Sequence, residues 1–408
     1  MNEIAESYVK LALAVGEHDA DYIDAYYGPP QWRDEAKAAR IPLESIQASA
    51  ARLLTALHQV PLEDSDELVQ LRHRYLVKQI EAMAARVGML RGKKLTFDEE
   101  ARSLYDAAPP ELSEAHFEKV LRSLEDLLPG RGPITQRYEI YRRAFIIPTD
   151  KLEVLFEAAI TECRARTKEH IDLPANERFE IEYVRNKSWS GYNWYKGDSY
   201  SLIQINTDLP ISIDRAVDLA AHEGYPGHHV YNALLEKHFV RERNWVEFSV
   251  YPLHSPQSLI AEGTANYGIE VAFPGGERVA FERERLFPLV EMAVTEAERY
   301  YRIHRLAVKL SYAHNEAARS YLNGKFNRAQ AEEFLVTYAL MSPERAKQRV
   351  RFIDTYRSYV INYNLGQDLV RNYIESRGGT ADRPGKRWEE FRLLISSPRL
   401  PSGLQVVL

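Results

Sequence analysis

The chain has 408 residues, and its 53 lysines and arginines against 59 aspartates and glutamates give a formal net charge of −6. Hydrophobic residues make up 45% of the chain and charged residues 27%, which is typical of soluble globular proteins and excludes global disorder. The acidic balance argues against a nucleic-acid-binding surface, which usually needs an excess of basic residues. A folded chain of this size buries about three quarters of its surface, so no metal or disulfide is needed merely to hold the fold.

The sequence also lacks the patterns of membrane and secreted proteins. Its longest uninterrupted apolar run, Leu11–Val15, is far shorter than the roughly 18 residues that a membrane helix needs. The N-terminal residues show no signal-peptide pattern, and Cys163 is the only cysteine, so no disulfide can form within the chain. We therefore expect a soluble cytoplasmic protein of one or two domains, with no membrane partner; the sequence leaves its oligomeric state open.

Most of the chain has the three-and-four spacing of apolar residues that predicts amphipathic helices. The clearest segments are 42–60, 113–128, a segment starting after Thr149, and 277–315 with a division near Pro288. Ser342-Pro343 is a typical helix start, and we expect that helix to run past Tyr363, with Gly366 as a weak point, and to finish near Gly378. Residues 1–150 are expected to form a helical subdomain and 151–408 a hydrolase region, although one continuous domain is the alternative.

Strand patterns are few and lie close together. Residues 179–183 alternate apolar and acidic side chains, and residues 200–206 alternate again after a connection over 188–198. Alternation of this kind is typical of strands with one solvated face. The fold class that follows is mainly α-helical, with a small antiparallel sheet at about 178–206.

One short stretch concentrates the chemistry. Residues 221–229 read Ala-His-Glu-Gly-Tyr-Pro-Gly-His-His, at the end of a helix that we expect to be capped by Ser212 or Asp214. Zinc in hydrolases is commonly held by histidine nitrogens and a carboxylate. The usual His-Glu-x-x-His spacing is absent, because Pro226 stands where the second histidine would be and must bend the helix. Spacing alone therefore does not choose between His228 and His229 as the partner of His222.

A third ligand is expected from a distant segment. Glu262 lies in the apolar, small-residue helix 259–267, where an unpaired carboxylate would be costly to bury. A metal ion would justify its position, with an arginine ion pair as the alternative. Asn266 lies one turn further on and could orient one of the metal ligands.

The pattern His222-Glu223-x-x-Pro226-Gly227-His228-His229 resembles the motif of the domain-of-unknown-function 885 family, and residues 262–265 and 357–367 resemble its two later blocks. That family is in turn similar to helical zinc peptidases. The resemblance covers roughly residues 180–375, and aligning the shared Gly-His pair makes His228 the second metal ligand. It also implies that the strand 200–206 is an edge strand that pairs with an extended substrate.

The predicted function is that of a metallopeptidase with one zinc ion held by His222, His228 and Glu262. Glu223 would act as the general base on the attacking water. Weaker candidates are Tyr363 and Arg357, as donors to an oxyanion or to a substrate carboxylate. His229 is expected either to donate to the oxyanion or to support the metal ligands. The substrate is expected to be a peptide or a small amide. The alternatives are a metal-dependent amidase acting on a non-peptide molecule and a non-catalytic helical metal-binding protein.

Overall fold

Helices make up most of the computed structural model, which describes residues 1–63 and 65–405. The helices of the first part are α1 (Asn2–Gly16), α2 (Pro30–Ala39), α3 (Leu43–His58), α4 (Glu67–Leu90), α5 (Phe97–Tyr105), α6 (Glu114–Glu125), α7 (Ile134–Arg143) and α8 (Leu152–Lys168). The central helices are α9 (Asp214–Leu219), α10 (His228–Leu235), α11 (Pro256–Ala272), α12 (Glu277–Phe281), α13 (Phe287–Leu289) and α14 (Ala297–Val308). The last are α15 (Ala313–Leu322), α16 (Arg328–Tyr338), α17 (Pro343–Tyr356), α18 (Ile361–Ser376) and α19 (Pro384–Ile395). The predicted mainly α-helical class is confirmed.

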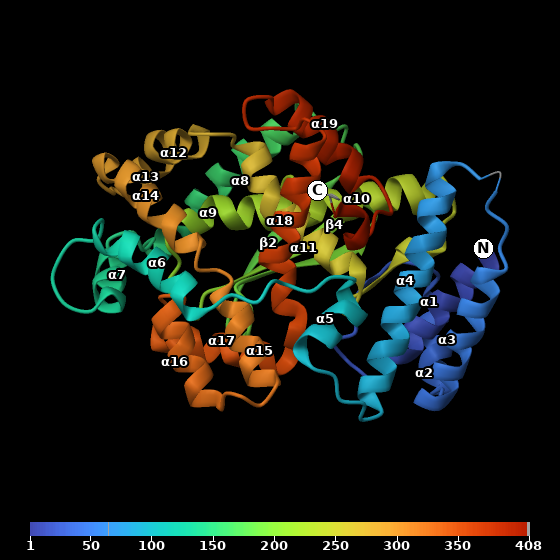
Figure 1. The fold of residues 1–408 in the computed structure, drawn as a ribbon. Helices are drawn as coiled ribbons and strands as arrows, with labels where there is room; N and C mark the ends of the chain where they lie inside the picture. The colour runs from blue at the N-terminus through green and yellow to red at the C-terminus, as the bar shows by residue number, and fades with distance from the viewer. Residues whose placement is uncertain (64, 406–408) are drawn as a thin grey trace.

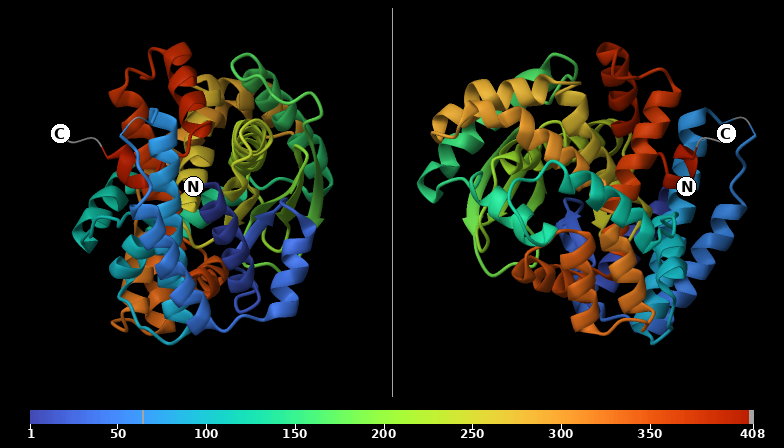
Figure 2. Two further views of the ribbon diagram at one scale, coloured as in Figure 1. Left: turned by 90° about the vertical axis from the view of Figure 1, so that its right-hand side faces the viewer. Right: turned by 60° about the vertical axis from the view of Figure 1, so that its left-hand side comes forward.

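The first helices lie along one side of the molecule, and α11 and α18 lie near its centre (Figures 1 and 2). Helix α3 forms where the apolar spacing predicted it, with Ile46, Ala50 and Leu57 fully buried. A short strand β1 (Ile23–Tyr26) pairs antiparallel with β5 (Val250–Pro252), so the N-terminal segment is joined to the middle of the chain. The predicted division near residue 150 stays a prediction. In the part of the chain that the structure describes, no helix has the length and apolar character needed to cross a membrane.

The small sheet precedes the histidine-rich motif as predicted, but its topology differs from the prediction. It contains β2 (Arg178–Val184), β3 (Gly191–Gly197) and β4 (Tyr200–Asn206) in the order β2-β4-β3. Strands β2 and β4 are parallel, and only β3 and β4 are antiparallel. The predicted antiparallel pairing of the first and last strands is therefore wrong, because the segment taken as a connection forms a strand of its own. Strand β4 is consequently central and β3 is an edge strand.

Helices α17 and α18 occupy the region where one long helix was predicted, and α18 packs against α11. Helix α17 starts as predicted, with the Ser342 hydroxyl accepting a hydrogen bond from the Arg345 amide at 3.3 Å. It ends at Tyr356, because Arg357 adopts a left-handed φ of 54°. Helix α18 then begins at Ile361. Gly366 is not a weak point as predicted. A Cβ atom on Gly263 of α11 would lie 2.5 Å from the Gly366 carbonyl oxygen, so the two glycines allow α11 and α18 to pack backbone to backbone.

Candidate metal centre

The histidine-rich motif folds back on itself at Gly227. Helix α9 starts at Asp214 without the predicted side-chain cap, continues into a π-helical turn over Ala220–Gly224, and α10 then begins at His228. The Gly227 amide donates a hydrogen bond to the Ala221 carbonyl at 2.9 Å. A Cβ atom at Gly227 would lie only 1.9 Å from the His222 carbonyl oxygen, so only glycine fits this position. The tight return places the first residue of α10 beside the π-helical turn.

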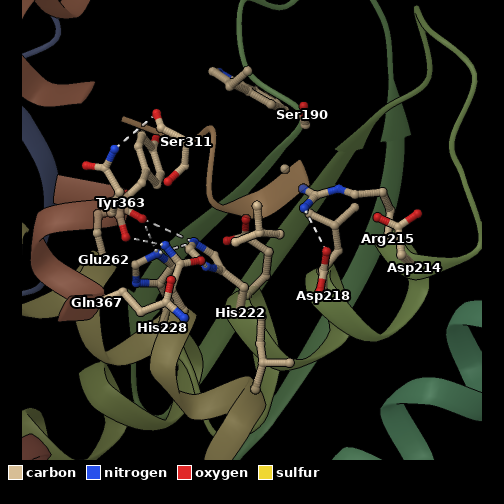
Figure 3. A pocket seen from close by; sticks show the side chains of 18 of the residues that line it. Ser190, Asp214, Arg215, Asp218, His222, His228, Glu262, Ser311, Tyr363 and Gln367 are labelled. Carbon is tan, nitrogen blue, oxygen red and sulfur yellow. Dashed lines mark hydrogen bonds and ion pairs between the residues drawn. The ribbon is translucent and has the colours of Figure 1, made fainter. Parts of the chain in front are cut away.

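Three side chains meet at this return in a triangle of potential ligand atoms (Figure 3). The Nε2 atoms of His222 and His228 are 3.1 Å apart, and Glu262 Oε2 lies 3.2 Å from the first and 3.6 Å from the second. Tetrahedral zinc with bonds of about 2.0–2.1 Å places its ligand atoms about 3.3 Å apart. The triangle therefore has the dimensions of three corners of a tetrahedral site, with the fourth corner left for water or substrate.

The surrounding contacts fit a metal ion at this position. His222 Nδ1 lies 3.0 Å from Asn266 Oδ1, and Asn266 Nδ2 donates to the Tyr363 carbonyl at 2.9 Å. This arrangement assigns the proton of His222 to Nδ1 and leaves the Nε2 lone pair free to coordinate. Tyr359 donates to Glu262 Oε1 at 2.8 Å, whereas the buried Oε2 atom has no hydrogen-bond partner among the described residues. An orphaned carboxylate oxygen beside two imidazole nitrogens is best satisfied by a cation.

Burial and charge at the triangle keep Glu262 ionised. Only 6% of this residue is exposed, and burial alone would raise the pKa of its carboxyl group. The adjacent imidazoles of His222 and His228 outweigh burial and hold the pKa of the Glu262 carboxyl group well below its ordinary value. No arginine forms an ion pair with Glu262 in the described part of the chain, so the alternative interpretation of this residue finds no support.

Glu223 lies beside the triangle and lines the same cavity, which has a volume of about 860 Å³. Burial raises the pKa of its carboxyl group to about 7, with a further contribution from the negative charge of Glu262. A Cβ atom on Gly191 would lie 2.7 Å from Glu223 Oε1, so the glycine at the start of β3 leaves room for this carboxylate. A carboxylate with this pKa can both accept and return a proton near neutral pH.

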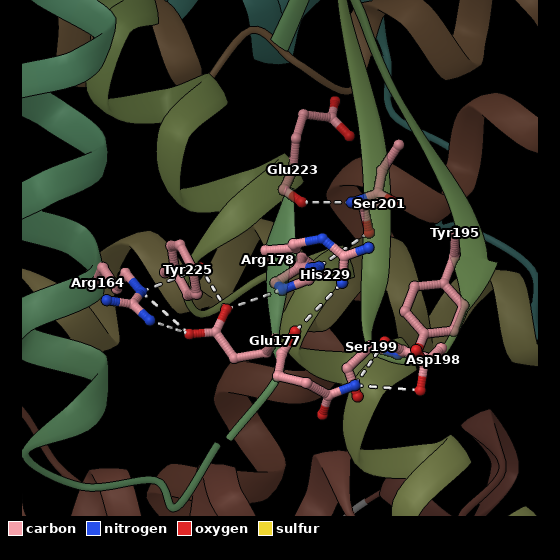
Figure 4. A network of polar contacts seen from close by, with 12 residues as sticks. Arg164, Glu177, Arg178, Tyr195, Asp198, Ser199, Ser201, Glu223, Tyr225 and His229 are labelled. Carbon is pink, nitrogen blue, oxygen red and sulfur yellow. Dashed lines mark hydrogen bonds and ion pairs between the residues drawn. The ribbon is translucent and has the colours of Figure 1, made fainter. Parts of the chain in front are cut away.

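His229 belongs to a separate network of polar contacts with Glu177 and Ser201 (Figure 4). It is fully buried, its Nδ1 lies 2.9 Å from Ser201 Oγ, and its Nε2 lies 3.1 Å from Glu177 Oε2. Successive residues at the start of α10 thus face opposite sides, His228 the cavity and His229 the sheet. The structure brings His228, and not His229, together with His222 and Glu262. The expected donation by His229 to an oxyanion finds no support, because both of its ring nitrogens contact Ser201 and Glu177 instead.

Arg357 is also held outside the cavity. Its Nε donates to Glu100 Oε2 at 2.7 Å, and the other oxygen of Glu100 accepts from the Ser358 amide and hydroxyl. The predicted role of Arg357 toward substrate therefore finds no support, because its side chain is paired with Glu100 of α5. Tyr363 does line the cavity, where burial and the negative charge of Glu262 raise the pKa of its hydroxyl group.

Several cavity residues were missed by sequence reasoning. Asp24 comes from β1, far outside the histidine-rich motif, and Tyr359 was not singled out within residues 357–367. Arg345 and Arg349 also line the cavity, from successive turns of α17. Their spacing of four residues after a clear helix start was the available signal, since it places both arginines on one helix face.

A second group of potential ligands in the cavity consists of Asp214, Asp218 and His304. Its charges already have partners. Arg278 lies 2.8 Å and Arg215 3.2 Å from Asp218, and Tyr300 donates to Asp214. Guanidinium groups here take the place that a metal ion would need, so the first triangle is the better candidate metal centre.

Comparison with solved structures gives a distant likeness of fold. A putative lipoprotein from Colwellia psychrerythraea superposes with a TM-score of 0.54 and 14% identity, over 89% of this chain and 68% of that chain. The M32 carboxypeptidase from Deinococcus radiodurans R1 gives a TM-score of 0.48 and 11% identity, over 100% of this chain and 92% of that chain. A structure described as CHT gives 0.42 and 11% over the same shares.

No family model matches the sequence, and no curated protein matches it. The resemblance to the domain-of-unknown-function 885 family therefore stays a prediction. At these identities the likeness to solved structures concerns the mainly helical fold alone.

Proposed function

We propose that this protein is a zinc-dependent peptidase with one ion held by His222, His228 and Glu262. The observation that supports the proposal most strongly is the triangle of ligand atoms 3.1–3.6 Å apart with Glu223 in the same cavity. Two imidazoles and a carboxylate with an open fourth position form a typical ligand set of catalytic zinc. The cavity volume of about 860 Å³ lies within the range of small-ligand sites and suits a short peptide.

A zinc ion bound by this set supplies a Lewis acid that polarises the scissile carbonyl and acidifies water. The chain's own residues supply the proton transfers. Glu223 takes a proton from the attacking water and gives it to the leaving amine. Asn266 holds His222 in the tautomer that binds metal, and Tyr359 fixes the Glu262 carboxylate.

Two further features would orient the substrate. Tyr363 lines the cavity beside Glu262 and keeps its proton at neutral pH, so its hydroxyl group can donate to the oxyanion that forms during hydrolysis. The edge strand β3 contributes Gly191 and Asn193 to the region of the cavity that adjoins Glu223. Its free edge can pair with an extended peptide backbone. The substrate-pairing role expected for residues 200–206 passes to β3, because β4 is central.

Metal analysis of purified variants tests the proposal. Wild type is expected to hold one zinc ion per chain, and His222→Ala, His228→Ala and Glu262→Ala are expected to lose it. His238→Ala serves as the control, because this histidine is not part of the cavity lining and contacts Glu242 instead. Glu223→Gln should retain zinc while peptide hydrolysis falls by about 10²- to 10⁴-fold.

A screen of short peptides measures the activity itself. Zinc binding without hydrolysis of any peptide would overturn the peptidase assignment and favour the amidase or non-catalytic alternatives. Normal hydrolysis by Glu223→Gln would overturn the general-base assignment.

A further inference from the structure

A cluster of arginines lines the cavity away from the triangle. Arg345 and Arg349 come from successive turns of α17, and Arg215 comes from α9. Figure 3 shows Arg215 and Asp218 well separated from the group formed by His228 and Glu262, across the same pocket. The cavity therefore has a metal-binding end and an arginine-rich end.

The positive charge of this cluster is not balanced by carboxylates. Arg215 pairs with Asp218 at 3.2 Å, but Asp218 also pairs with Arg278 at 2.8 Å. Within the described residues, no carboxylate oxygen lies within 4.0 Å of the guanidinium group of Arg345 or Arg349. The nearby Asp214 is engaged by the Tyr300 hydroxyl group and faces His304.

The contacts that Arg345 and Arg349 do make leave donors unused. One nitrogen of Arg345 donates to the Pro210 carbonyl at 2.6 Å, and the Arg349 guanidinium lies 5.2 Å from the centre of the Phe352 ring. A guanidinium group carries five donors in a planar fork that matches a carboxylate or phosphate. Both side chains are partly buried and line the cavity.

This arrangement carries an energetic cost in the absence of an anion. Like charges four residues apart on a helix repel each other. Burial, followed by the positive charges of Arg142 and Arg215, lowers the pKa of Arg345 to about 10. Burial also lowers the pKa of Arg349 below its ordinary value. A bound anion would offset this repulsion and part of the desolvation cost through its attraction to both guanidinium groups.

We propose that Arg345 and Arg349 form an anion-binding subsite that holds the free carboxylate of a peptide substrate while its scissile bond lies at the metal centre. The identification of the anion as part of a peptide rests on the proposed function, whereas the anion subsite itself does not. Tyr363 links the two ends of the cavity, since its hydroxyl group is influenced by the charges of both Glu262 and Arg349. The subsite would thus select substrates by charge at a point away from the reacting carbonyl.

Calorimetric titration of zinc-loaded Glu223→Gln tests this inference without turnover. The probes are N-acetyl-tetraalanine with a free carboxylate and the same peptide as its C-terminal amide. The free acid is expected to bind about 10- to 100-fold more tightly, which is the range for hydrogen bonds to charged groups. Arg349→Met, introduced into Glu223→Gln, should erase this difference.

The matched control is Arg351→Met, because Arg351 lies on the same helix but is exposed and outside the cavity lining. It should preserve the preference for the free acid. Arg349→Lys keeps the charge but loses the fork, so it should give an intermediate preference while thermal unfolding stays near wild type. If the acid binds no more tightly than the amide, or if Arg349→Met matches Arg351→Met, the subsite is not as proposed.

Inorganic phosphate distinguishes the source of the anion. Phosphate is expected to compete weakly with the free acid. If phosphate binds in an Arg349-dependent way while acid and amide bind alike, the carboxylate assignment is overturned and a phosphorylated ligand takes its place. Because these titrations need no hydrolysis, failure of the peptidase proposal would appear in the activity screen and failure of the subsite in binding.

Discussion

Two buried clusters of histidine and glutamate flank the start of α10, and only one of them is suited to hold a metal. On one side, His228 and His222 face Glu262, whose Oε2 has no hydrogen-bond donor among the described residues. On the other side, His229 faces Glu177, whose oxygens accept from Arg164, Tyr225 and His229. Both carboxylates are buried, but the first faces two histidines and has an unpaired oxygen, whereas the second faces one histidine and already pairs with Arg164 and Tyr225.

The comparison separates a binding site from a structural contact. A carboxylate with all its oxygens paired stabilises the fold and offers no coordination position. A carboxylate with one orphaned oxygen, next to two nitrogens at metal-binding spacing, costs stability unless a cation fills the gap. The same criterion excludes Asp214, Asp218 and His304 as the preferred metal site, because arginine and tyrosine donors already pair with their carboxylate oxygens.

The largest expected effects come from replacing each of the two adjacent histidines with alanine in a separate variant. His228→Ala should remove zinc from the purified protein and abolish peptide hydrolysis, with little loss of stability in the metal-free state. His229→Ala should retain zinc but lower the free energy of unfolding by about 2–4 kcal/mol. The substitution creates a cavity and leaves the hydrogen-bonding partners of the imidazole unpaired. Metal analysis and urea unfolding in chelator measure the two quantities. Loss of zinc from His229→Ala with unchanged stability would reverse the assignment.

The sequence predicted much of the metal centre because its chemistry is local. The motif at 221–229 and the isolated glutamate at 262 were both recognisable from residue type and context. The choice between His228 and His229 was not, since it depends on a π-helical turn and on the close contact of Gly227 with the His222 carbonyl. Neither feature follows from residue spacing on a regular helix.

Long-range arrangement accounts for the remaining errors. The strand over 191–197 was missed because glycine and polar residues interrupt its alternation, and without it the parallel pairing of β2 and β4 could not be foreseen. Arg357 was expected to reach the substrate from a continuous helix. A left-handed residue ends that helix and turns the side chain away, while Arg345 and Arg349 on the same helix line the cavity instead.

A smaller effect is expected from the residues that orient the two histidines. Asn266→Ala removes the acceptor that fixes the His222 tautomer, and we expect zinc affinity to fall by about 10- to 100-fold. Ser201→Ala is the matched change on the other cluster, since Ser201 contacts His229 at 2.9 Å in the same way. It should leave zinc affinity unchanged. Competition with a fluorescent zinc chelator measures both, and equal losses would remove the distinction between the clusters.

The smallest expected effect concerns Asp24, which lines the cavity near the triangle and accepts a hydrogen bond from Tyr192. Burial raises the pKa of its carboxyl group to about 6, against an ordinary value of 3.8. The folded chain therefore binds this proton more tightly than the unfolded chain. Stability from this residue is fully present below pH 4 and is lost as the pH rises through about 6.

Asp24→Asn should remove that dependence. In the presence of chelator, the free energy of unfolding of the variant is expected to rise relative to wild type by up to about 2 kcal/mol between pH 4 and pH 7. This figure is reduced because water in the cavity screens the charge of Asp24. Asp21→Asn, at an exposed position on the same segment, should follow wild type. Urea unfolding across this pH range measures the gain, and a difference that does not change with pH would show that Asp24 does not titrate as inferred. Added zinc should reduce the stability difference between Asp24→Asn and wild type, because a dication at the triangle favours the charged carboxylate of Asp24. A cation bound elsewhere would leave this difference unchanged.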